Sequence, residues 1–478
     1  MAGMFELGER KVRPGAYFNI QKRGVENATT TVNGTVAVIG AADFGPTGTV
    51  KRFDASEDYL KIYGSGRITS VIKEAIAGGA QTIVACRIGS GGNAATVDLK
   101  DDGETPSVAV TITAKYPGVK EFTVTLKTKL SDDSKKECVI YAGTSAFETV
   151  EFAVGEGEAA ALAEAINKTD AFVAEVATGK DAAELENISQ KAFTAGTNPA
   201  TTVNDYADAL ALIEAYDFNV LCTDTTSNSV HFLINSFVNR VEDAGLFVMA
   251  VIAESHTVDL ATRMQRAAGY NNEKIVYVLN GWMNEAGRQI DHYNTAARIA
   301  GMIAASSSAS SLTHTVVNST WELKEPLTNT QMIEAETKGC LVLSSNAANQ
   351  TWIDSAINTL VTPSDTQDEG WKKIRRTKTR FELMRRMNAL ADTLIGKIDN
   401  DDNGRATVVS QLQTIGDAMV EEDKIISCTV SESDTYAPEG DSAWFNIDIV
   451  DKDSMEHIYL IYSFAFSMVA TATETERL

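Results

Sequence analysis

The chain has 478 residues, of which 44% are hydrophobic and 22% charged, a composition typical of globular proteins and a length that predicts two to four domains. Its 42 Lys and Arg against 65 Asp and Glu give a net charge of −23, which disfavours binding to nucleic acid or to anionic membranes. The apolar runs are too short to span a bilayer and the first ten residues lack a secretory pattern, so we expect cytoplasmic synthesis and no direct membrane insertion.

The first strand-like run lies close to the N-terminus. Ala16, Phe18 and Ile20 alternate with other side chains behind a turn signal at Pro14 and Gly15, and a period of two indicates a β-strand. A strand at a chain end keeps a row of N–H and C=O groups unpaired until another strand joins it. We therefore expect an N-terminal arm over residues 1–30 whose strand needs a partner.

Residues 31–90 have the order of a β-α-β unit. A compact apolar run at 35–39 precedes a turn-rich loop at 43–48, and a second apolar run lies at 82–88. The helical segments between these two runs are at 56–62 and 68–77. This order predicts the first part of an α/β core.

The pattern changes in residues 91–200, which begin with a glycine cluster and are rich in Thr and Val. Residues alternate at 108–113 and at 122–126, as in strands. A helix is expected near 158–168, and the segment ends in a turn at 196–199. We expect a separate, mainly β insertion domain.

Helices and short apolar strands alternate again over residues 201–320. The expected strands are at 219–223, 246–253 and 274–280, and the expected helices are at 203–215, 230–243, 258–268 and 295–305. This alternation indicates a largely parallel sheet that is covered on both faces. These three strands and the two that precede the insertion would form one sheet.

Residues 321–455 predict a C-terminal α+β domain. Its helices are expected near 330–339, 371–395 and 406–418, and its strands at 425–430 and 443–450. The predicted fold class is therefore α/β and α+β, multidomain, with a largely parallel α/β sheet core, a mainly β insertion, a C-terminal α+β domain and strand arms at both ends.

The last alternating run lies in a C-terminal strand arm over residues 456–478. One face of it carries Ile458, Leu460, Tyr462, Phe464, Phe466 and Met468. Such a strand either completes a sheet of its own chain or is lent to a neighbouring chain.

A basic helix is the strongest polar signal. Residues 371–386 contain eight Lys and Arg and one acid, Glu382, so the segment carries +7 and leaves −30 (−23 − 7) for the rest of the chain. Apolar residues at steps of three and four make it amphipathic, and we expect its basic side to face away from the core. It could be a solvated face that balances nearby acids, a docking surface for an acidic partner, or, less in keeping with the net charge, a nucleic-acid site.

Motifs for catalysis or for cofactors do not emerge. The five cysteines have no metal-ligand or redox spacing, which predicts buried free thiols, and the five histidines have no zinc spacing. The glycines at 89–92 are followed by a β insertion instead of a helix, which disfavours a nucleotide site. Residues 399–404 match the first half of a calcium loop, but its twelfth position is Ser410, so a solvated turn is the preferred interpretation. We expect no catalytic residue, no metal and no cofactor.

Several segments together resemble the contractile tail sheath proteins of bacteriophages and R-type bacteriocins, especially of the Gram-positive type. The resemblance spans nearly the whole chain in the family's order. It rests on RPGAYFNI (13–20), GTVAVIGAADFGPTGTV (34–50), AKYPG (114–118), YDFNVLC (216–222), AARIAGMIA and SLTHTVV (within 296–317), KGCLVL (338–343), INTL (357–360) and DSMEHIYLIYSF (453–464). Two departures lie in or beside the insertion, at residues 119–121 and 193–199.

The resemblance implies a structural subunit and not an enzyme. It implies stacked hexameric rings that form a helical sheath around an inner tube, contraction that drives the tube through a target envelope, and strand arms that add to a small sheet of adjacent subunits. It also implies assembly in the bacterial cytoplasm, a place in a phage tail or bacteriocin particle, and contacts with the inner tube, baseplate and tail terminator proteins.

The resemblance further implies that a helix of the C-terminal domain contacts the inner tube. We assign this role to the basic helix, with Lys372, Lys373, Arg376 and Arg380 as contacts because steps of three and four residues bring them together. The alternatives are an α/β enzyme of unknown substrate, based on the parallel-sheet pattern, and a nucleic-acid-binding protein that uses residues 371–386.

Overall fold

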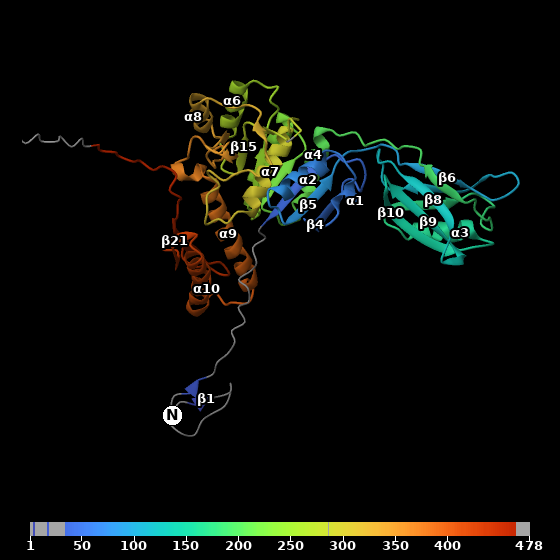
Figure 1. Cartoon of the computed structure of the whole chain (residues 1–478). Coiled ribbons are helices and arrows are strands. Elements are labelled where there is room, and N and C mark those ends of the chain that lie inside the picture. The colour runs from blue at the N-terminus through green and yellow to red at the C-terminus, as the bar shows by residue number, and fades with distance from the viewer. Residues whose placement is uncertain (1–2, 5–16, 19–33, 285, 465–478) are drawn as a thin grey trace, which may run out of the picture.

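A computed structural model describes residues 3–4, 17–18, 34–284 and 286–464 (Figure 1). The described chain mixes helices and strands in several packed units, so the prediction of a mixed α/β, multidomain protein is confirmed. The division of the chain into arms, core, insertion and C-terminal domain at the expected residues stays a prediction.

The centre of the molecule is a seven-stranded sheet in the order β18-β15-β14-β13-β3-β5-β4. Neighbouring strands are parallel, except that β4 runs antiparallel to β5 at the edge. The strands are β3 (Thr35–Gly40), β4 (Val50–Asp54), β5 (Thr82–Arg87), β13 (Val220–Thr223), β14 (Met249–Ile252), β15 (Ile275–Val278) and β18 (Cys340–Leu341). The strands between the two edges are almost entirely buried, as in a parallel sheet with helices on both faces.

Helices cover the two faces of this sheet and form two apolar cores. One face packs α2 (Arg67–Ala77) and α7 (His292–Ala305). The other face packs α4 (Val203–Ile213), α5 (Asn228–Asp243), α6 (Leu260–Tyr270) and α8 (Asn329–Thr337), while the short α1 (Tyr59–Tyr63) precedes α2. Helices α2 and α7 approach closely, since a Cβ atom on Gly301 would lie 2.0 Å from the carbonyl oxygen of Ala75.

Two strands of this sheet differ from the expectations. Strand β4 is missing from the expected elements, because only one of its five residues is buried and the apolar signal of an edge strand is therefore weak. Strand β18 lies within the predicted C-terminal domain of residues 321–455, yet it pairs with β15 of the main sheet. The order of elements along the chain does not show which strand pairs with the edge of a sheet.

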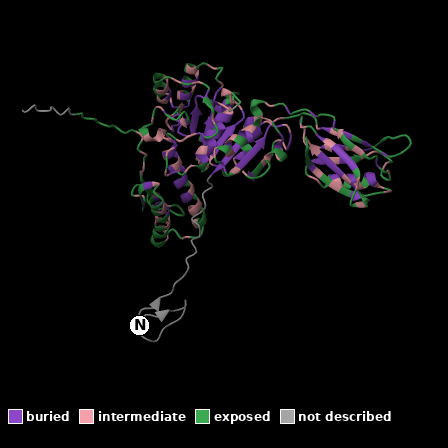
Figure 2. Cartoon of the chain, viewed as in Figure 1, coloured by how far each residue is buried: buried purple, intermediate pink, exposed green. Residues whose placement is uncertain are grey.

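The insertion forms two small antiparallel sheets with a core of its own (Figure 2). The first has the order β10-β9-β8-β12 and contains Ser145–Ala153, Asp132–Ala142, Thr123–Lys129 and Ile188–Ala192. The second has the order β11-β7-β6 and contains Phe172–Val176, Val108–Ala114 and Thr96–Lys100, and α3 is Glu158–Asn167. The chain enters and leaves side by side, through antiparallel bridges that join Ser90 to Ala200 and Asn93 to Thr197.

The C-terminal part packs two long helices against a hairpin. These are α9 (Ile374–Leu394), α10 (Asp402–Glu421), β21 (Ile425–Glu432) and β22 (Phe445–Asp451), with a 3₁₀ turn, η1 (Glu369–Lys372), before α9. Short two-stranded pairs complete the described chain: β16 (Trp282–Met283) with β17 (Glu322–Leu323), β19 (Leu343–Ser345) with β20 (Thr351–Ile353), and β1 (Gly3–Met4) with β2 (Tyr17–Phe18). Leu383, Met387, Leu412, Met419 and Cys428 belong to the small core between α9, α10 and β21.

Candidate assembly surfaces

The C-terminal arm leaves the body of the protein as an extended, exposed chain (Figures 1 and 2). Residues 452–464 are in neither a helix nor a strand of this subunit. Ile458, Leu460, Tyr462 and Phe464 are 70%, 67%, 72% and 86% exposed. A contiguous row of large apolar side chains in water indicates an interaction surface. The predicted arm residues Ala16, Ile20 and Phe466 lie outside the described residues, and Phe18 belongs to β2.

The hairpin of β21 and β22 is a second incomplete element. It is a two-stranded sheet, so in the described chain the outer edge of β22 has no strand beside it. Cys428 and Val430 of β21 are buried near α10, but their partners on β22, Ile449 and Ile447, are exposed. An isolated two-stranded sheet is marginally stable, and an open edge accepts a further strand.

The basic helix predicted over residues 371–386 exists as η1 and α9, but its side chains have partners within the chain. Arg376 donates to Asp451 at 2.7 Å and to Asp368 at 2.9 Å. Arg380 donates to Glu273 at 2.6 Å, and its guanidinium lies 3.6 Å from the ring centroid of Trp371. Burial lowers the pKa of Arg380, although the charge of Glu273 opposes this shift.

The two lysines assigned to tube contact differ from each other. Lys373 donates to Asp453 at 2.7 Å and lies 3.2 Å from Glu456. Burial by itself would lower the pKa of Lys373, but the bond to Asp453 and the charge of Glu456 outweigh it and raise the pKa. Lys372 lies 3.7 Å from Glu369, its charge also acts on Glu336, and its side chain is 42% exposed. Of the four assigned residues, Lys372 is therefore the one whose charge faces solvent most freely.

The expectation that the basic side of this helix faces away from the protein core is wrong. Arg375 and Arg386 are buried, and Arg386 pairs with Glu382 at 2.5 Å and with Glu422 at 2.7 Å. Lys378 donates to Ser306 Oγ at 2.7 Å, and burial lowers the pKa of its amine to about 7. The reason is that the fold brings carboxylates from distant segments to this helix, which a local count of charge does not include.

A crevice where an enzyme of this architecture would bind its ligand is filled by the protein itself. In an open parallel sheet, ligands bind at the carboxyl ends of the strands where the strand order reverses, here between β3 and β13. Asp224 follows β13 there and accepts hydrogen bonds from Ala41 N at 2.8 Å and from Tyr206 Oη at 2.5 Å. Arg67 lies 3.2 Å from the same carboxylate, and a Cβ atom on Gly40 would lie 2.7 Å from Asp224 Cβ. Burial raises the pKa of Asp224.

The remaining sequence signals concern structure. All five cysteines are free and buried, as predicted. In the calcium-like segment, Asp401 accepts from Gly404 N at 2.7 Å and so caps the start of α10. Among the described residues there is no cluster of His, Cys, Asp and Glu fit for a metal ion, and none of their helices could cross a bilayer.

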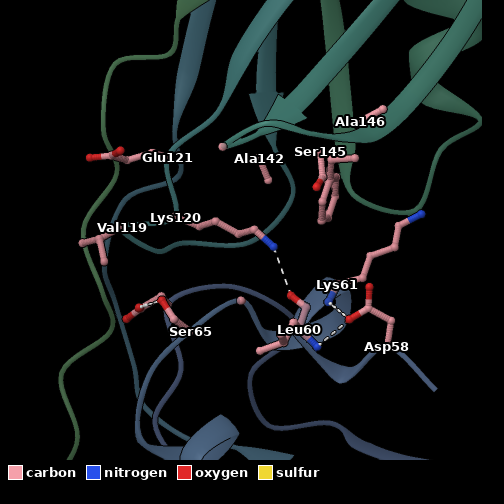
Figure 3. A pocket seen from close by; sticks show the side chains of 14 residues that line it. Asp58, Leu60, Lys61, Ser65, Val119, Lys120, Glu121, Ala142, Ser145 and Ala146 are labelled. Atoms are coloured by element: carbon pink, nitrogen blue, oxygen red, sulfur yellow. Dashed lines mark hydrogen bonds between the residues drawn. The ribbon is translucent and has the colours of Figure 1, made fainter. Parts of the chain in front are cut away.

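An open cavity of about 650 Å³ lies between the main sheet unit and the insertion (Figure 3). Lys120 reaches across it and donates to Leu60 O at 3.1 Å, with its ammonium 4.4 Å from the ring centroid of Phe147. Lys61 lies 3.8 Å from Glu148 on the insertion side. Burial lowers the pKa of Lys120 to about 8. These contacts join the main sheet unit to the insertion across the cavity.

Comparison with known proteins points to one family. Residues 200–359 match the family described as phage tail sheath protein central domain. The phage-like element PBSX protein XkdK of Bacillus subtilis (strain 168) is 25% identical over 382 residues, which cover 75% of each chain. The sheath tail protein from Desulfitobacterium hafniense has a TM-score of 0.69 at 18% identity and covers 92% of this chain and 100% of its own. The helical sheath of the anti-feeding prophage in its contracted state has a TM-score of 0.53 at 10% identity, over 95% of this chain and 99% of its own.

The resemblance to contractile tail sheath proteins is therefore confirmed, and the fold is that of tail sheath proteins. The matched residues 200–359 include β13, β14, β15 and α7 of the main sheet unit. The sequence analysis missed three acids at the base of the C-terminal arm, here called the arm root: Asp451, Asp453 and Glu456. One signal could have found them, because these acids are opposite in charge to the cations of residues 372–376.

Proposed function

We propose that this chain, which contains the phage tail sheath domain, is a structural subunit of a contractile tail sheath. Subunits assemble as stacked hexameric rings, form a helical sheath around an inner tube, and contract to drive the tube through a target envelope. The single observation that supports this most strongly is the exposed apolar arm at residues 458–464, together with the open edge of β22.

The arm of one subunit adds to the hairpin of a neighbour by β-augmentation. The arm residues are Ala16, Phe18, Ile20, Ile458, Leu460, Tyr462, Phe464 and Phe466. Burial of the four described C-terminal side chains, at about 1.5–3 kcal/mol each, and a few new backbone bonds at about 1 kcal/mol each give a gross gain on the order of 10 kcal/mol per arm. The cost of ordering the arm reduces this gain, but several kcal/mol per link suffices in a lattice with many links.

The inner tube contact by α9 is a second part of the proposal. Lys372 is the best placed of the four assigned residues, because Lys373, Arg376 and Arg380 are engaged with carboxylates of their own subunit. We also propose contacts with baseplate and tail terminator proteins, assembly in the bacterial cytoplasm, and no enzymatic, cofactor-dependent or nucleic-acid-binding role.

Electron microscopy of the purified full chain tests the assembly. We expect striated tubes or rings, and we expect removal of all residues after Met455 to leave a folded subunit that forms neither. Circular dichroism checks that the truncated subunit is folded, because its main sheet and helices lie outside the removed segment. Tubes from the truncated chain would contradict the linking role of the arm, and a full chain that stays monomeric would contradict the sheath proposal.

The two alternatives make different predictions. An α/β enzyme requires an open ligand site, but the crevice between β3 and β13 is occupied by Asp224 and its partners. A nucleic-acid site on residues 371–386 requires free cations, but most of these side chains already pair with carboxylates. Binding of duplex DNA that weakens steeply with salt would favour the second alternative.

A further inference from the structure

The root of the C-terminal arm is held by the first turn of the basic helix α9. Lys373 donates to Asp453 at 2.7 Å, Arg375 Nη1 donates to Ser454 Oγ at 2.7 Å, and Arg376 Nε donates to Asp451 at 2.7 Å. Three contacts thus fix residues 451–454, which are the last residue of β22 and the three residues after it.

A second group of contacts fixes Glu456. One of its carboxylate oxygens accepts hydrogen bonds from Ser311 Oγ and from Thr313 Oγ1, both at 3.0 Å. The other oxygen lies 3.2 Å from Lys373 Nζ. The Glu456 side chain is only 12% exposed, so this ion pair is screened by water and salt less than a surface pair.

The contacts end abruptly after this residue. From Ile458 to the last described residue, Phe464, no hydrogen bond or ion pair joins the arm to its own subunit, and the side chains are exposed. The boundary between the held and the free chain therefore lies at His457 and Ile458, and not at the end of β22.

The cations at the start of α9 explain why the acidic arm root binds there. Helix α9 begins with Lys373 as its N-cap, has Arg375 and Arg376 in its first turn, and has neither a side-chain cap nor an acidic residue there. Cations at a helix N-terminus oppose the helix dipole, whereas anions there are stabilising. The carboxylates of Asp451, Asp453 and Glu456 supply the negative charge that the helix itself lacks.

We propose that the start of α9, with Ser311 and Thr313, is a socket that fixes the direction in which the C-terminal arm leaves the subunit. Lys373, Arg375 and Arg376 are its positioning residues, and the hinge of the arm is at residues 457–458. This inference rests on the proposed function, because the direction of an arm matters for a chain that links to its neighbours.

The socket connects the arm to the centre of the protein. Ile374 and Phe381 of α9 are buried in the core of the main sheet unit, so a force on the arm root is transmitted to that unit through a helix. Holding the arm root restricts the region that the arm can reach, which raises the effective concentration of the arm at a hairpin within that region.

Site-directed spin labelling of the full chain tests the socket in the unassembled fraction isolated by size exclusion. The five native cysteines are buried, so a nitroxide reagent reaches an introduced thiol selectively. We compare Met455→Cys, inside the held segment and with its side chain in solvent, with Tyr459→Cys, beyond the hinge. We expect a restricted spectrum at 455 and a mobile one at 459; equal mobility at the two positions overturns the proposal.

Charge variants then identify the socket residues. Lys373→Glu should raise the mobility of the nitroxide at position 455 to that of the nitroxide at position 459. Adding Asp453→Lys and Glu456→Lys to the Lys373→Glu chain should make the nitroxide at 455 restricted again. Lys372→Glu is the matched control, because Lys372 contacts neither Asp453 nor Glu456, and it should leave the spectrum at 455 unchanged. If Lys373→Glu reduces the helical circular dichroism, Glu456→Gln, which lies outside α9, replaces it.

The socket and the proposed sheath function can be refuted independently of each other. Unaltered mobility at 455 in the Lys373→Glu chain, or loss of restriction in the Lys372→Glu control, overturns the socket even where the full chain forms tubes. Absence of tubes from the full chain contradicts the proposed function, while the label at 455 still decides whether the root is held.

Discussion

One aromatic side chain anchors the main sheet unit in the apolar core of the insertion. Phe44 lies in the loop after β3, but it is 3% exposed and belongs to the apolar core of the insertion. Its ring makes edge-to-face contacts with Tyr116, Phe122 and Phe147, with centroids 5.5, 5.4 and 5.8 Å apart. We therefore expect Phe44→Ala to loosen the insertion while leaving the main sheet intact.

The magnitude follows from burial. Replacing a fully buried Phe by Ala costs about 3–5 kcal/mol. For a unit of about 100 residues, each kcal/mol shifts the unfolding midpoint by about 4–8 °C, so the transition of the insertion should fall by at least about 10 °C. Other contacts at the junction are polar, among them Asn198 to Asp43 at 3.0 Å, Arg87 to Pro117 O at 2.8 Å and Lys120 to Leu60 O at 3.1 Å.

Calorimetry and limited proteolysis measure the two effects. Phe44→Ala should lower the transition of the insertion and also expose the connecting segments at residues 89–95 and 194–200 to protease. Phe193→Ala is the matched control, because Phe193 belongs to the same apolar core but comes from the insertion side. It should lower the same transition with a smaller effect on the connecting segments. Connecting segments that remain as protected in Phe44→Ala as in the unaltered chain would refute the role of Phe44 as the anchor.

Two further predictions concern the basic helix. The hydrogen bond from Arg386 lowers the pKa of Glu422 to about 2, so its contribution to stability is complete above the ordinary value of 4.5 and is lost as the pH falls through about 2. Glu422→Gln should therefore lower the melting temperature at pH 7, with a difference that shrinks from pH 4.5 toward pH 2; a constant difference would contradict the pairing. Lys372→Glu should change the free energy of unfolding by no more than about 0.5 kcal/mol, as expected for a surface substitution. It should nevertheless reduce co-sedimentation of the sheath with its inner tube. Unchanged co-sedimentation would contradict the assigned contact.

The main elements of the fold could be predicted because they depend on local patterns. The buried strand at 35–40 and the strand at 220–223 are continuous apolar runs, and helices such as α2 have a clear apolar face. The exposed edge strand β4 lacks such a pattern. The pairing of β18 with β15 and the anchoring of Phe44 in the insertion depend on contacts between distant segments. Periodicity does not encode such contacts.

The linking role of the C-terminal arm stays a prediction, and it is based on a different kind of pattern. Its apolar residues at 458–464 are exposed, so no contact among the described residues accounts for them. The sequence can show that such a strand needs a partner, since a period of two specifies a face and large apolar residues specify burial. It cannot show which sheet accepts the strand, and β22 becomes a candidate only because the fold leaves its outer edge open.

The basic helix shows how a correct observation about charge can suggest the wrong orientation. Residues 371–386 carry a net charge of +7. This segment forms a cationic surface in the folded protein only if carboxylates from other segments do not pair with it. Here Asp451, Asp453 and Glu456 approach its first turn, and Glu273 and Glu422 approach its later turns. In a chain of net charge −23, a cationic segment attracts the chain's own acids before it meets a partner. The acids that contact its first turn are those of the arm root, so the helix proposed to contact the inner tube also holds the segment through which this protein would dock to its neighbours.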